Sequence, residues 1–356
     1  MATHRWHYCR EALAVHYLET LKTGPQSLAI FAERRKGKTE FCKYDLIPHA
    51  ESQGYRCVYI NFWQDKANPS ACVVESITNS LERDLTGILR GWKKEVSLKL
   101  GALQDKISKN PVATPSTANE AFSCLLRTKE PILLICDEVQ HLATNPAFED
   151  FTASLRTFID SNKDRTRVVF TGSSQDNLNR LFRRQKAAFY NSAPLTPFHD
   201  MGEEFIKFLT DLFYSLTKRK LPAKDIMKTY INHHYSPAFI VELLQVMVRD
   251  GYYDMESGLD YYLSLNPPDQ EHELTWKNIN ALDKEVLKLI ATQNDPQLYS
   301  SSTLEKIRSA IGVAVKKGTV QASLKKLREL GVLLNSGRGE WEFENSSFKE
   351  YVLLQL

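Results

Sequence analysis

The chain has 356 residues and a mass of 40.8 kDa, which is enough for two or three domains. It is 42% hydrophobic and 25% charged, as a globular protein with a real core should be, and its net charge of +3 does not by itself indicate a nucleic-acid partner. No apolar run approaches the roughly 18 to 20 residues of a membrane span, and the N-terminus lacks the apolar segment of a signal peptide.

The cysteines indicate a reducing compartment. They are scattered without a C-x-x-C pair, and several lie in apolar runs. We interpret them as buried free thiols rather than as a metal site or a disulfide framework, and we expect a cytoplasmic protein with no membrane partner. They are Cys9, Cys42, Cys57, Cys72, Cys124 and Cys136.

The first 200 residues alternate between strand-like and helix-like segments. Short apolar runs that end in polar residues predict buried strands, and amphipathic segments between them predict helices. Strand, helix and strand in this order form right-handed parallel units, so the sequence predicts an α/β fold with a parallel sheet. The expected strands lie within residues 27–32, 55–63, 131–142 and 165–174, and the expected helices within residues 5–21, 38–54 and 70–89.

Residues 87–117 differ from their surroundings. They are rich in lysine at first and in proline, threonine and serine later. A charged run of this kind is typical of an exposed helix followed by a loop. The functional alternative is an insertion that binds a partner or a nucleic acid.

A phosphate-binding loop is indicated by "AERRKGKT", residues 32–39, directly after the first expected strand. The template is G-x-x-x-x-G-K-[ST], and seven of its eight positions fit in the right context. Gly37 lets backbone N–H groups face phosphate oxygens, Lys38 supplies a charge for the β and γ phosphates, and Thr39 offers a hydroxyl to Mg²⁺. The residues expected to bind the nucleotide are Glu33, Arg34, Arg35, Lys36, Gly37, Lys38, Thr39 and Glu40.

Ala32 departs from this template, because the first position is usually glycine. If the position needs a positive φ, alanine costs about 1 kcal/mol relative to glycine. Such a cost would weaken the loop without removing Lys38 or Thr39. A lone G-K-T could also arise by chance, and its lysine would then be an ordinary surface residue.

An acidic pair, Asp137 and Glu138, follows the apolar run "ILLIC" immediately. Asp137 at the end of a strand can hold Mg²⁺, and the neighbouring Glu138 can orient and deprotonate an attacking water. The alternative is a pair of acids that stabilises a helix N-terminus through the helix dipole. Because ligands bind at the carboxyl ends of parallel strands, the loop and the acids together favour an ATP–Mg²⁺ site.

Two further elements are candidates for catalysis. The fourth strand ends in the hydroxyl residues Thr171, Ser173 and Ser174. One of these hydroxyls, above all that of Ser173, could touch the γ-phosphate or the attacking water. The alternative is that Ser173 or Ser174 caps the following helix. Arg183 and Arg184 lie in a basic segment, and one of them could act as an arginine finger across a subunit boundary of a homo-oligomer. The alternative for them is a solvated basic face or a patch for an anionic partner.

The rest of the chain is predominantly helical in pattern, and consecutive prolines make residues 266–273 a linker candidate. We expect three units, which are residues 1–197, 198–270 and 275–356. Within the last unit, helices are expected near residues 279–293, 302–311 and 319–330, and two short strands around residues 336–339.

"AERRKGKTEF", "PILLICDEVQHL" and "VVFTGSSQDNLNRLF" resemble motifs of the AAA+-related P-loop ATPases of the archaeal-ATPase and STAND type. The likeness is greatest to bacterial ATP-binding proteins of the AAA family, and it covers most of the chain. It implies ATP and Mg²⁺ at Lys38, Thr39, Asp137 and Glu138, and a helical lid over residues 198–270. The lid of this group often carries a sensor arginine near a proline, whereas here Ser236 precedes the proline.

Residues 275–356 resemble a winged helix, whose recognition helix would be "GTVQASLKKLRELGVL". In nucleic-acid binders this geometry puts a helix in the major groove and a basic wing on the backbone. The unit holds nine lysines and three arginines against nine acidic residues, a modest balance, and winged helices also dock proteins. The residues expected to contact DNA or a partner are Lys316, Lys317, Lys325, Lys326, Arg328 and Arg338.

These features predict an ATP-hydrolysing switch protein that works on double-stranded DNA as an oligomer. One alternative is a STAND-like signalling or defence ATPase whose winged helix docks a protein effector. Another is a module that binds nucleotide without hydrolysing it. The biological role in each of these three hypotheses is an analogy with proteins of similar fold.

Overall fold

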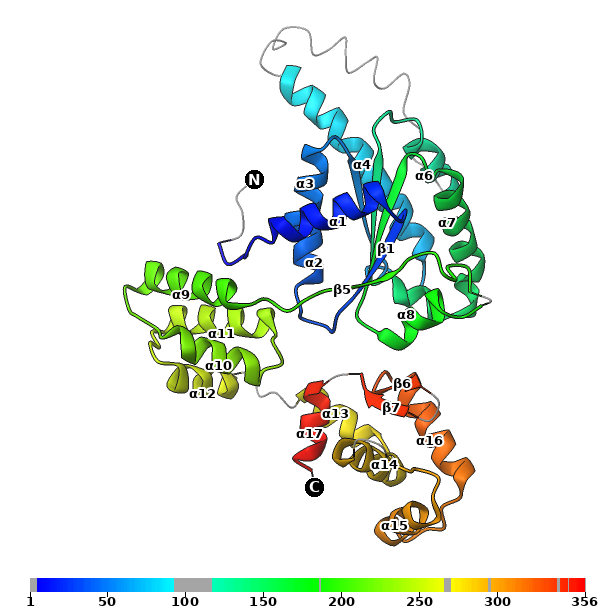
Figure 1. The fold of residues 1–356 in the computed structure, drawn as a ribbon, viewed down its shortest axis with the longest axis vertical. Helices are drawn as coiled ribbons and strands as arrows, with labels where there is room; N and C mark the ends of the chain where they lie inside the picture. Colours follow the sequence, from blue (N-terminus) through cyan, green and yellow to red (C-terminus); the bar gives the residue numbers. More distant parts are fainter. Residues whose placement is uncertain are drawn as a thin grey trace.

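The structure is a computed structural model that describes residues 5–92, 117–185, 187–265, 270–293, 296–337, 340–344 and 346–355. Figure 1 shows a sheet-containing part, a group of helices beside it and a C-terminal part below. Most of the 87–117 segment and Arg338, the expected wing tip, lie outside the described residues.

A five-stranded parallel sheet with the order β2-β3-β4-β1-β5 forms the centre of the first 200 residues. Four strands match the sequence prediction. The fifth, β5, was not predicted, because it has three residues and ends in proline, which can only pair at an edge. The bounds are β1 Ser27–Phe31, β2 Arg56–Asn61, β3 Ile132–Asp137, β4 Thr166–Gly172 and β5 Leu195–Pro197.

Each face of the sheet is covered by its own set of helices. Successive residues of a strand point to opposite faces, so Ala29 packs with one hydrophobic cluster and Ile30 with the other. In Figure 1, α1 and α3 lie on one side, and α6 and α7 lie on the other. The helices of this part are α1 Glu11–Thr23, α2 Lys38–Phe41, α3 Ile47–Ser52, α4 Pro69–Trp92, α6 Ala118–Leu125, α7 Glu149–Ser161 and α8 Gln175–Phe182; two short 3₁₀ turns, Val139–Ala143 and Pro146–Phe148, follow β3.

The helix predicted after the phosphate loop is interrupted. A π-helical turn, Cys42–Leu46, separates α2 from α3. Pro48 explains the interruption, since a proline has no N–H and its ring crowds the carbonyl four residues earlier. The π-helical turn keeps the chain helical, and Asp45 within it is buried.

Four helices follow the sheet and enclose a separate hydrophobic cluster that extends from Phe205 to Tyr262. They are α9 Glu203–Thr217, α10 Ala223–Asn232, α11 Pro237–Asp250 and α12 Met255–Leu265. Gly251, in the left-handed region at φ 78°, ends α11 and starts the turn into α12. We refer to these four helices as the lid helices, after the lid that the resemblance leads us to expect here.

The C-terminal part encloses another cluster, from Ile279 to Val352. Its elements are α13 Gln270–Asn278, α14 Ala281–Thr292, α15 Ser301–Ile311, α16 Lys317–Glu329, β6 Leu333–Gly337, β7 Glu340–Phe343 and α17 Ser346–Leu353. Helices followed by an antiparallel hairpin lie where a winged helix is expected, and assignment to that fold stays a prediction. The linker expected over residues 266–273 is too long, because α13 begins at Gln270; a proline bars a helix around itself but not one that starts after it.

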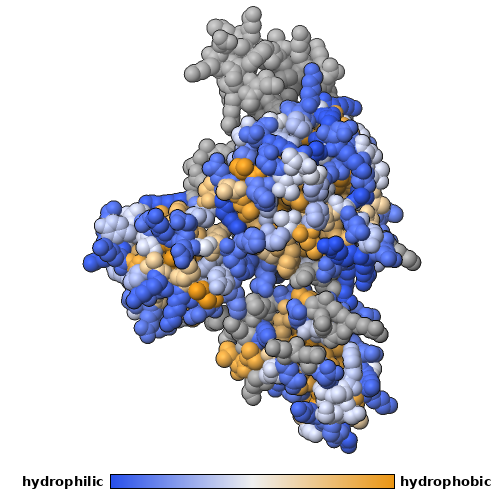
Figure 2. Space-filling view, in the orientation of Figure 1, coloured by the Kyte–Doolittle hydropathy of each residue, from blue (hydrophilic) through white to orange (hydrophobic). Residues whose placement is uncertain are grey.

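Among the described residues, no helix combines the length and the apolar composition that crossing a bilayer requires. Figure 2 shows hydrophobic residues on this face only in small groups among hydrophilic ones.

Candidate functional site

The phosphate loop and the acidic pair meet at the carboxyl edge of the sheet. The loop follows β1, Asp137 ends β3, and β4 lies between these two strands. Thr39 Oγ1 donates a hydrogen bond to Asp137 Oδ2 at 2.8 Å, although the residues are 98 positions apart. The two motifs that sequence analysis singled out therefore form one site.

The backbone of the phosphate loop adopts the left-handed conformation at Arg35 and not at Ala32. Arg35 has a φ of 65° and Gly37 one of 87°, whereas Ala32 is absent from the residues with positive φ. The cost expected for Ala32 therefore does not arise, and the strain falls three residues later. A non-glycine residue in this region is uncommon and is held by its surroundings.

Lys38 lies inside the loop. Its ammonium donates a hydrogen bond to the carbonyl oxygen of Glu33 at 2.8 Å and another to that of Ala32. The residue is 5% exposed, and burial lowers the pKa of Lys38, while the nearby charges of Glu138 and Asp137 act in the opposite direction. The ammonium of Lys38 is suited to bind an anionic phosphate through charge-assisted hydrogen bonds.

Asp137 is 1% exposed and accepts hydrogen bonds from hydroxyl groups on three different elements. Their donors are Thr39, Tyr59 of β2 and Thr171 of β4. Burial and the Asp137 carboxylate raise the pKa of Tyr59, so its hydroxyl keeps its proton. Sequence analysis missed Tyr59, since a tyrosine in a strand looks like an ordinary β-residue.

The oxygen donors at Asp137 and Thr39 fit Mg²⁺. This ion prefers one or two protein oxygens with water and phosphate completing its shell, so no all-protein cage is needed. Within the described residues, no group of three or more His, Cys, Asp or Glu side chains could hold a metal by itself. The groups that donate hydrogen bonds to the Asp137 carboxylate are three hydroxyls and the backbone N–H of Glu138; all are neutral, so they leave its negative charge for a cation to neutralise.

Glu138 has a left-handed backbone, at φ 55°, directly after the buried strand. Its Oε2 accepts a hydrogen bond from Ser173 Oγ at 2.8 Å and another from the amide of Gln140, whose nitrogen also lies 3.2 Å from Ser173 Oγ. The structure thus places Ser173 and Gln140 on Glu138, and the predicted contact of Ser173 with a phosphate or a water stays a prediction. Strained non-glycine residues of this kind gather at active sites.

Gly172, the last residue of β4, makes room for this cluster. A Cβ there would lie 2.6 Å from Gln140 Oε1 and 2.9 Å from both terminal carbons of Leu178. Leu178 is 1% exposed, so it has little freedom to move. The glycine of "TGSS" therefore has a packing role beside the acid.

The remaining loop residues point in different directions. Arg34 places its guanidinium 5.0 Å from the ring of Trp63, and the ammonium of Lys66 lies 3.6 Å from the same ring. Glu40 is exposed on α2, and Glu33 is half-buried. Sequence analysis missed Trp63, because the apolar pattern places it at the end of an expected strand, whereas it lies in the turn after β2.

Arg35 and Lys36 contact the lid helices and their connection to the sheet. Arg35 pairs with Glu242 of α11, and the ammonium of Lys36 lies 2.8 Å from Asp200 Oδ1. Ser236, at the position where a sensor arginine was considered, accepts a hydrogen bond from the backbone N–H of Phe239 and so caps α11. These two loop residues are therefore bound by protein groups.

Arg183 and Arg184 are exposed just after the C-terminal end of α8. Ser173 lies just before the N-terminal end of that helix, so the two ends are about 10 Å apart along the helix axis. The structure does not bring these arginines to Glu138 of their own chain. A finger role stays a prediction that requires a second copy.

The basic residues expected to contact DNA differ in their surroundings. Lys326 lies 2.6 Å from Asp283 Oδ2, and Asp283 is 1% exposed and also accepts from Ser323. The Lys325 side chain is 78% exposed and lies 3.8 Å from Glu329. Lys316 and Lys317 are exposed and Arg328 is half-buried. Lys326 therefore has a structural partner, whereas Lys325 is available to a ligand.

Comparisons with known proteins identify the fold. The Walker-type ATPase PABY2304 of Pyrococcus abyssi superposes with a TM-score of 0.60 at 16% identity, over 97% of this chain and 95% of that chain. The ORC2 protein of Aeropyrum pernix in its ADP form gives 0.61 at 14% identity, over 97% and 92%. The ORC1 protein of the same organism, in complex with DNA, gives 0.51 at 14% identity, also over 97% and 92%. No protein-family model and no curated protein matches the sequence.

At these identities the likeness concerns the fold alone. It confirms the predicted α/β fold with a P-loop NTPase core, and it agrees with the resemblance to AAA+-related ATPases. The likeness extends over nearly the whole chain, lid helices and C-terminal part included.

Proposed function

Because the chain has the fold of Walker-type P-loop ATPases, we propose that it binds Mg-ATP and hydrolyses it as a conformational switch. The observation that supports this most is the meeting of the phosphate loop with Asp137 at a hydrogen-bond distance of 2.8 Å. The solved ADP form of a protein with this fold is consistent with nucleotide binding.

Each residue of the site has a distinct task in this proposal. Lys38 and the backbone N–H groups of the loop bind the phosphates, and the start of the helix adds a favourable dipole. Thr39 and Asp137 would hold Mg²⁺, which when bound neutralises charge on the phosphate oxygens. Glu138 orients a water and takes its proton, and Ser173 and Gln140 hold the Glu138 carboxylate in place.

We further propose three functional units, residues 1–197, 198–270 and 275–356, which correspond to the separate hydrophobic clusters. The middle unit is a lid, and the last is a winged helix. A homo-oligomer would let Arg183 or Arg184 reach the nucleotide of a neighbouring copy. We propose that the protein acts in the cytoplasm.

Association with double-stranded DNA is the favoured role of the C-terminal unit. The exposed lysines of α16 and the turn before it supply a positive surface, and one solved structure with this fold contains DNA. The alternative is a STAND-like ATPase whose C-terminal unit docks a protein effector. Binding to duplex DNA with a steep salt dependence favours the first role.

We expect Lys317→Glu combined with Lys325→Glu to weaken duplex binding by about tenfold or more and to lower the salt slope by about two, because two phosphate contacts are lost. Fluorescence anisotropy of a labelled duplex at several salt concentrations measures both quantities. Lys207→Glu with Lys224→Glu makes the same charge change on exposed lid positions and serves as the control. Equal losses in both double variants, or none in either, would exclude specific binding through α16.

A further inference from the structure

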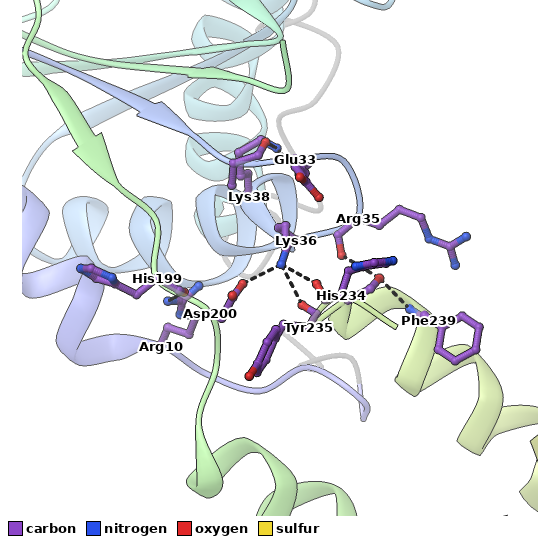
Figure 3. A network of polar contacts seen from close by, with 12 residues as sticks. Arg10, Glu33, Arg35, Lys36, Lys38, His199, Asp200, His234, Tyr235 and Phe239 are labelled. Atoms are coloured by element: carbon purple, nitrogen blue, oxygen red, sulfur yellow. Dashed lines mark hydrogen bonds and ion pairs between the residues drawn. The ribbon is translucent and has the colours of Figure 1, made fainter. Parts of the chain in front are cut away.

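The lid helices form hydrogen bonds with the backbone of the phosphate loop at Arg35 (Figure 3). The carbonyl oxygen of Arg35 accepts a hydrogen bond from Ser236 Oγ at 3.4 Å and faces the backbone N–H of Ala238 at 3.5 Å. Both donors belong to the first turn of α11, and they lie about 200 positions from the loop in the sequence. The contact therefore joins a lid helix to the loop directly.

Lys36 makes a second contact between the same partners. Its ammonium donates to the carbonyl oxygen of His234 at 2.6 Å, to that of Tyr235 at 3.4 Å and to Asp200 at 2.8 Å. Asp200 lies in the connection between β5 and α9, where Arg10 holds the carbonyl oxygen of His199 at 2.8 Å. The ammonium of Lys36 is thus bound by the lid helices and their connection to the sheet, and only 14% of its side chain is exposed.

Strained backbone is concentrated at this contact. Arg35, His234 and Tyr235 have φ values of 65°, 56° and 50°, and they are half of the non-glycine residues with positive φ in the described part of the chain. Such conformations persist where neighbouring groups hold them. Each side of the contact therefore stabilises the unusual conformation of the other.

The orientation of one peptide group connects this contact to phosphate binding. In a trans peptide the C=O and the following N–H point in opposite directions. Because the Arg35 carbonyl points toward α11, the N–H of Lys36 points away from the lid. In a phosphate loop, such N–H groups are donors to phosphate oxygens.

We propose that Ser236 and Asp200 are positioning residues, which act through Arg35 and Lys36 to hold the phosphate loop in its nucleotide-binding form. This inference rests on the proposed function and adds to it a mechanical link between the lid and the affinity for nucleotide. Release of the lid frees the Arg35 peptide to turn, and the loop loses a phosphate donor. The lid therefore acts on the loop backbone, without a sensor arginine at position 236.

The test measures the dissociation constant of a fluorescent ADP, mant-ADP, for the full chain. Ser236→Ala should raise it about tenfold, since one hydrogen bond of the loop is lost. Ser236→Thr keeps the hydroxyl and should restore wild-type affinity. Asp200→Asn, which removes the charged partner of Lys36, should also weaken binding several-fold.

Ser236→Asp separates positioning from helix capping, because Ser236→Ala also removes the cap of α11. Aspartate caps a helix about as well as serine, but its ionised carboxylate has no proton to donate to the Arg35 carbonyl oxygen. Positioning therefore predicts that Ser236→Asp weakens mant-ADP binding at least as much as Ser236→Ala does. Wild-type affinity in Ser236→Asp, or in both variants, would overturn the proposal. A wild-type chain that fails to bind mant-ADP would instead overturn the proposed function.

Discussion

Lys38→Ala is expected to weaken the binding of ATP by a hundredfold or more. The ammonium is the buried cation of the loop, and its loss removes charge-assisted bonds to phosphate that are worth roughly 1.5–3 kcal/mol each. Titration of the purified chain with mant-ATP, in the presence of Mg²⁺, measures the change.

The control for this variant is Lys207→Ala, which removes an exposed lysine from α9 and should leave the affinity unchanged. Circular dichroism shows whether each variant is folded. A folded Lys38→Ala chain with wild-type affinity would mean that nucleotide, if bound at all, binds elsewhere.

Glu138→Gln should reduce turnover of ATP by about 10² to 10⁴, the usual contribution of a general base. The amide is similar in size to the carboxylate and cannot take a proton from water, so binding of ATP should stay within a few-fold of wild type. Release of inorganic phosphate, measured with and without duplex DNA, gives the rate.

Glu149→Gln provides the matched control, because Glu149 is an exposed acid at the start of α7 and should be dispensable for turnover. If Glu138→Gln hydrolyses ATP at the wild-type rate, Glu138 is not the base. If the wild-type chain shows no turnover while it binds ATP, the binding-only alternative is favoured.

The site could be predicted from sequence where function depends on short, local patterns. The residues of the loop and the acidic pair are each contiguous, and the rule that ligands bind at the carboxyl ends of parallel strands placed them together. The strain at Arg35 was not predictable, because a template of residue types says nothing about which position adopts a positive φ. The template singles out Ala32 instead, a position that has no positive φ.

The residues that hydrogen-bond to the acidic pair could not be predicted from the sequence, for a different reason. Tyr59 and Gln140 act through contacts with residues that are distant in sequence or in an irregular turn, and neither has a pattern of its own. Lys326 shows the reverse case, since its type and spacing indicated an exposed ligand contact. The burial of Asp283 on α14, which pairs with it, can be seen only in the fold.

The hydrogen bonds between the lid helices and the phosphate loop could not be predicted from the sequence either. Its key acceptors are the carbonyl oxygens of Arg35, His234 and Tyr235, which every residue type possesses. The AAA+-related ATPases that the sequence resembles often carry an arginine where this chain has Ser236. The serine found there caps α11 and binds the loop with the same oxygen atom.

The most direct measurement of the central idea, that the loop and the acidic strand hold one Mg²⁺–ATP together, is the Mg²⁺ dependence of mant-ATP affinity in the wild-type chain and in Asp137→Asn. Our account predicts that Mg²⁺ strengthens wild-type binding by about tenfold or more and strengthens binding by the variant little, because the carboxylate that favours the ion is gone. Equal enhancement by Mg²⁺ in both proteins, or none in the wild type, would contradict it.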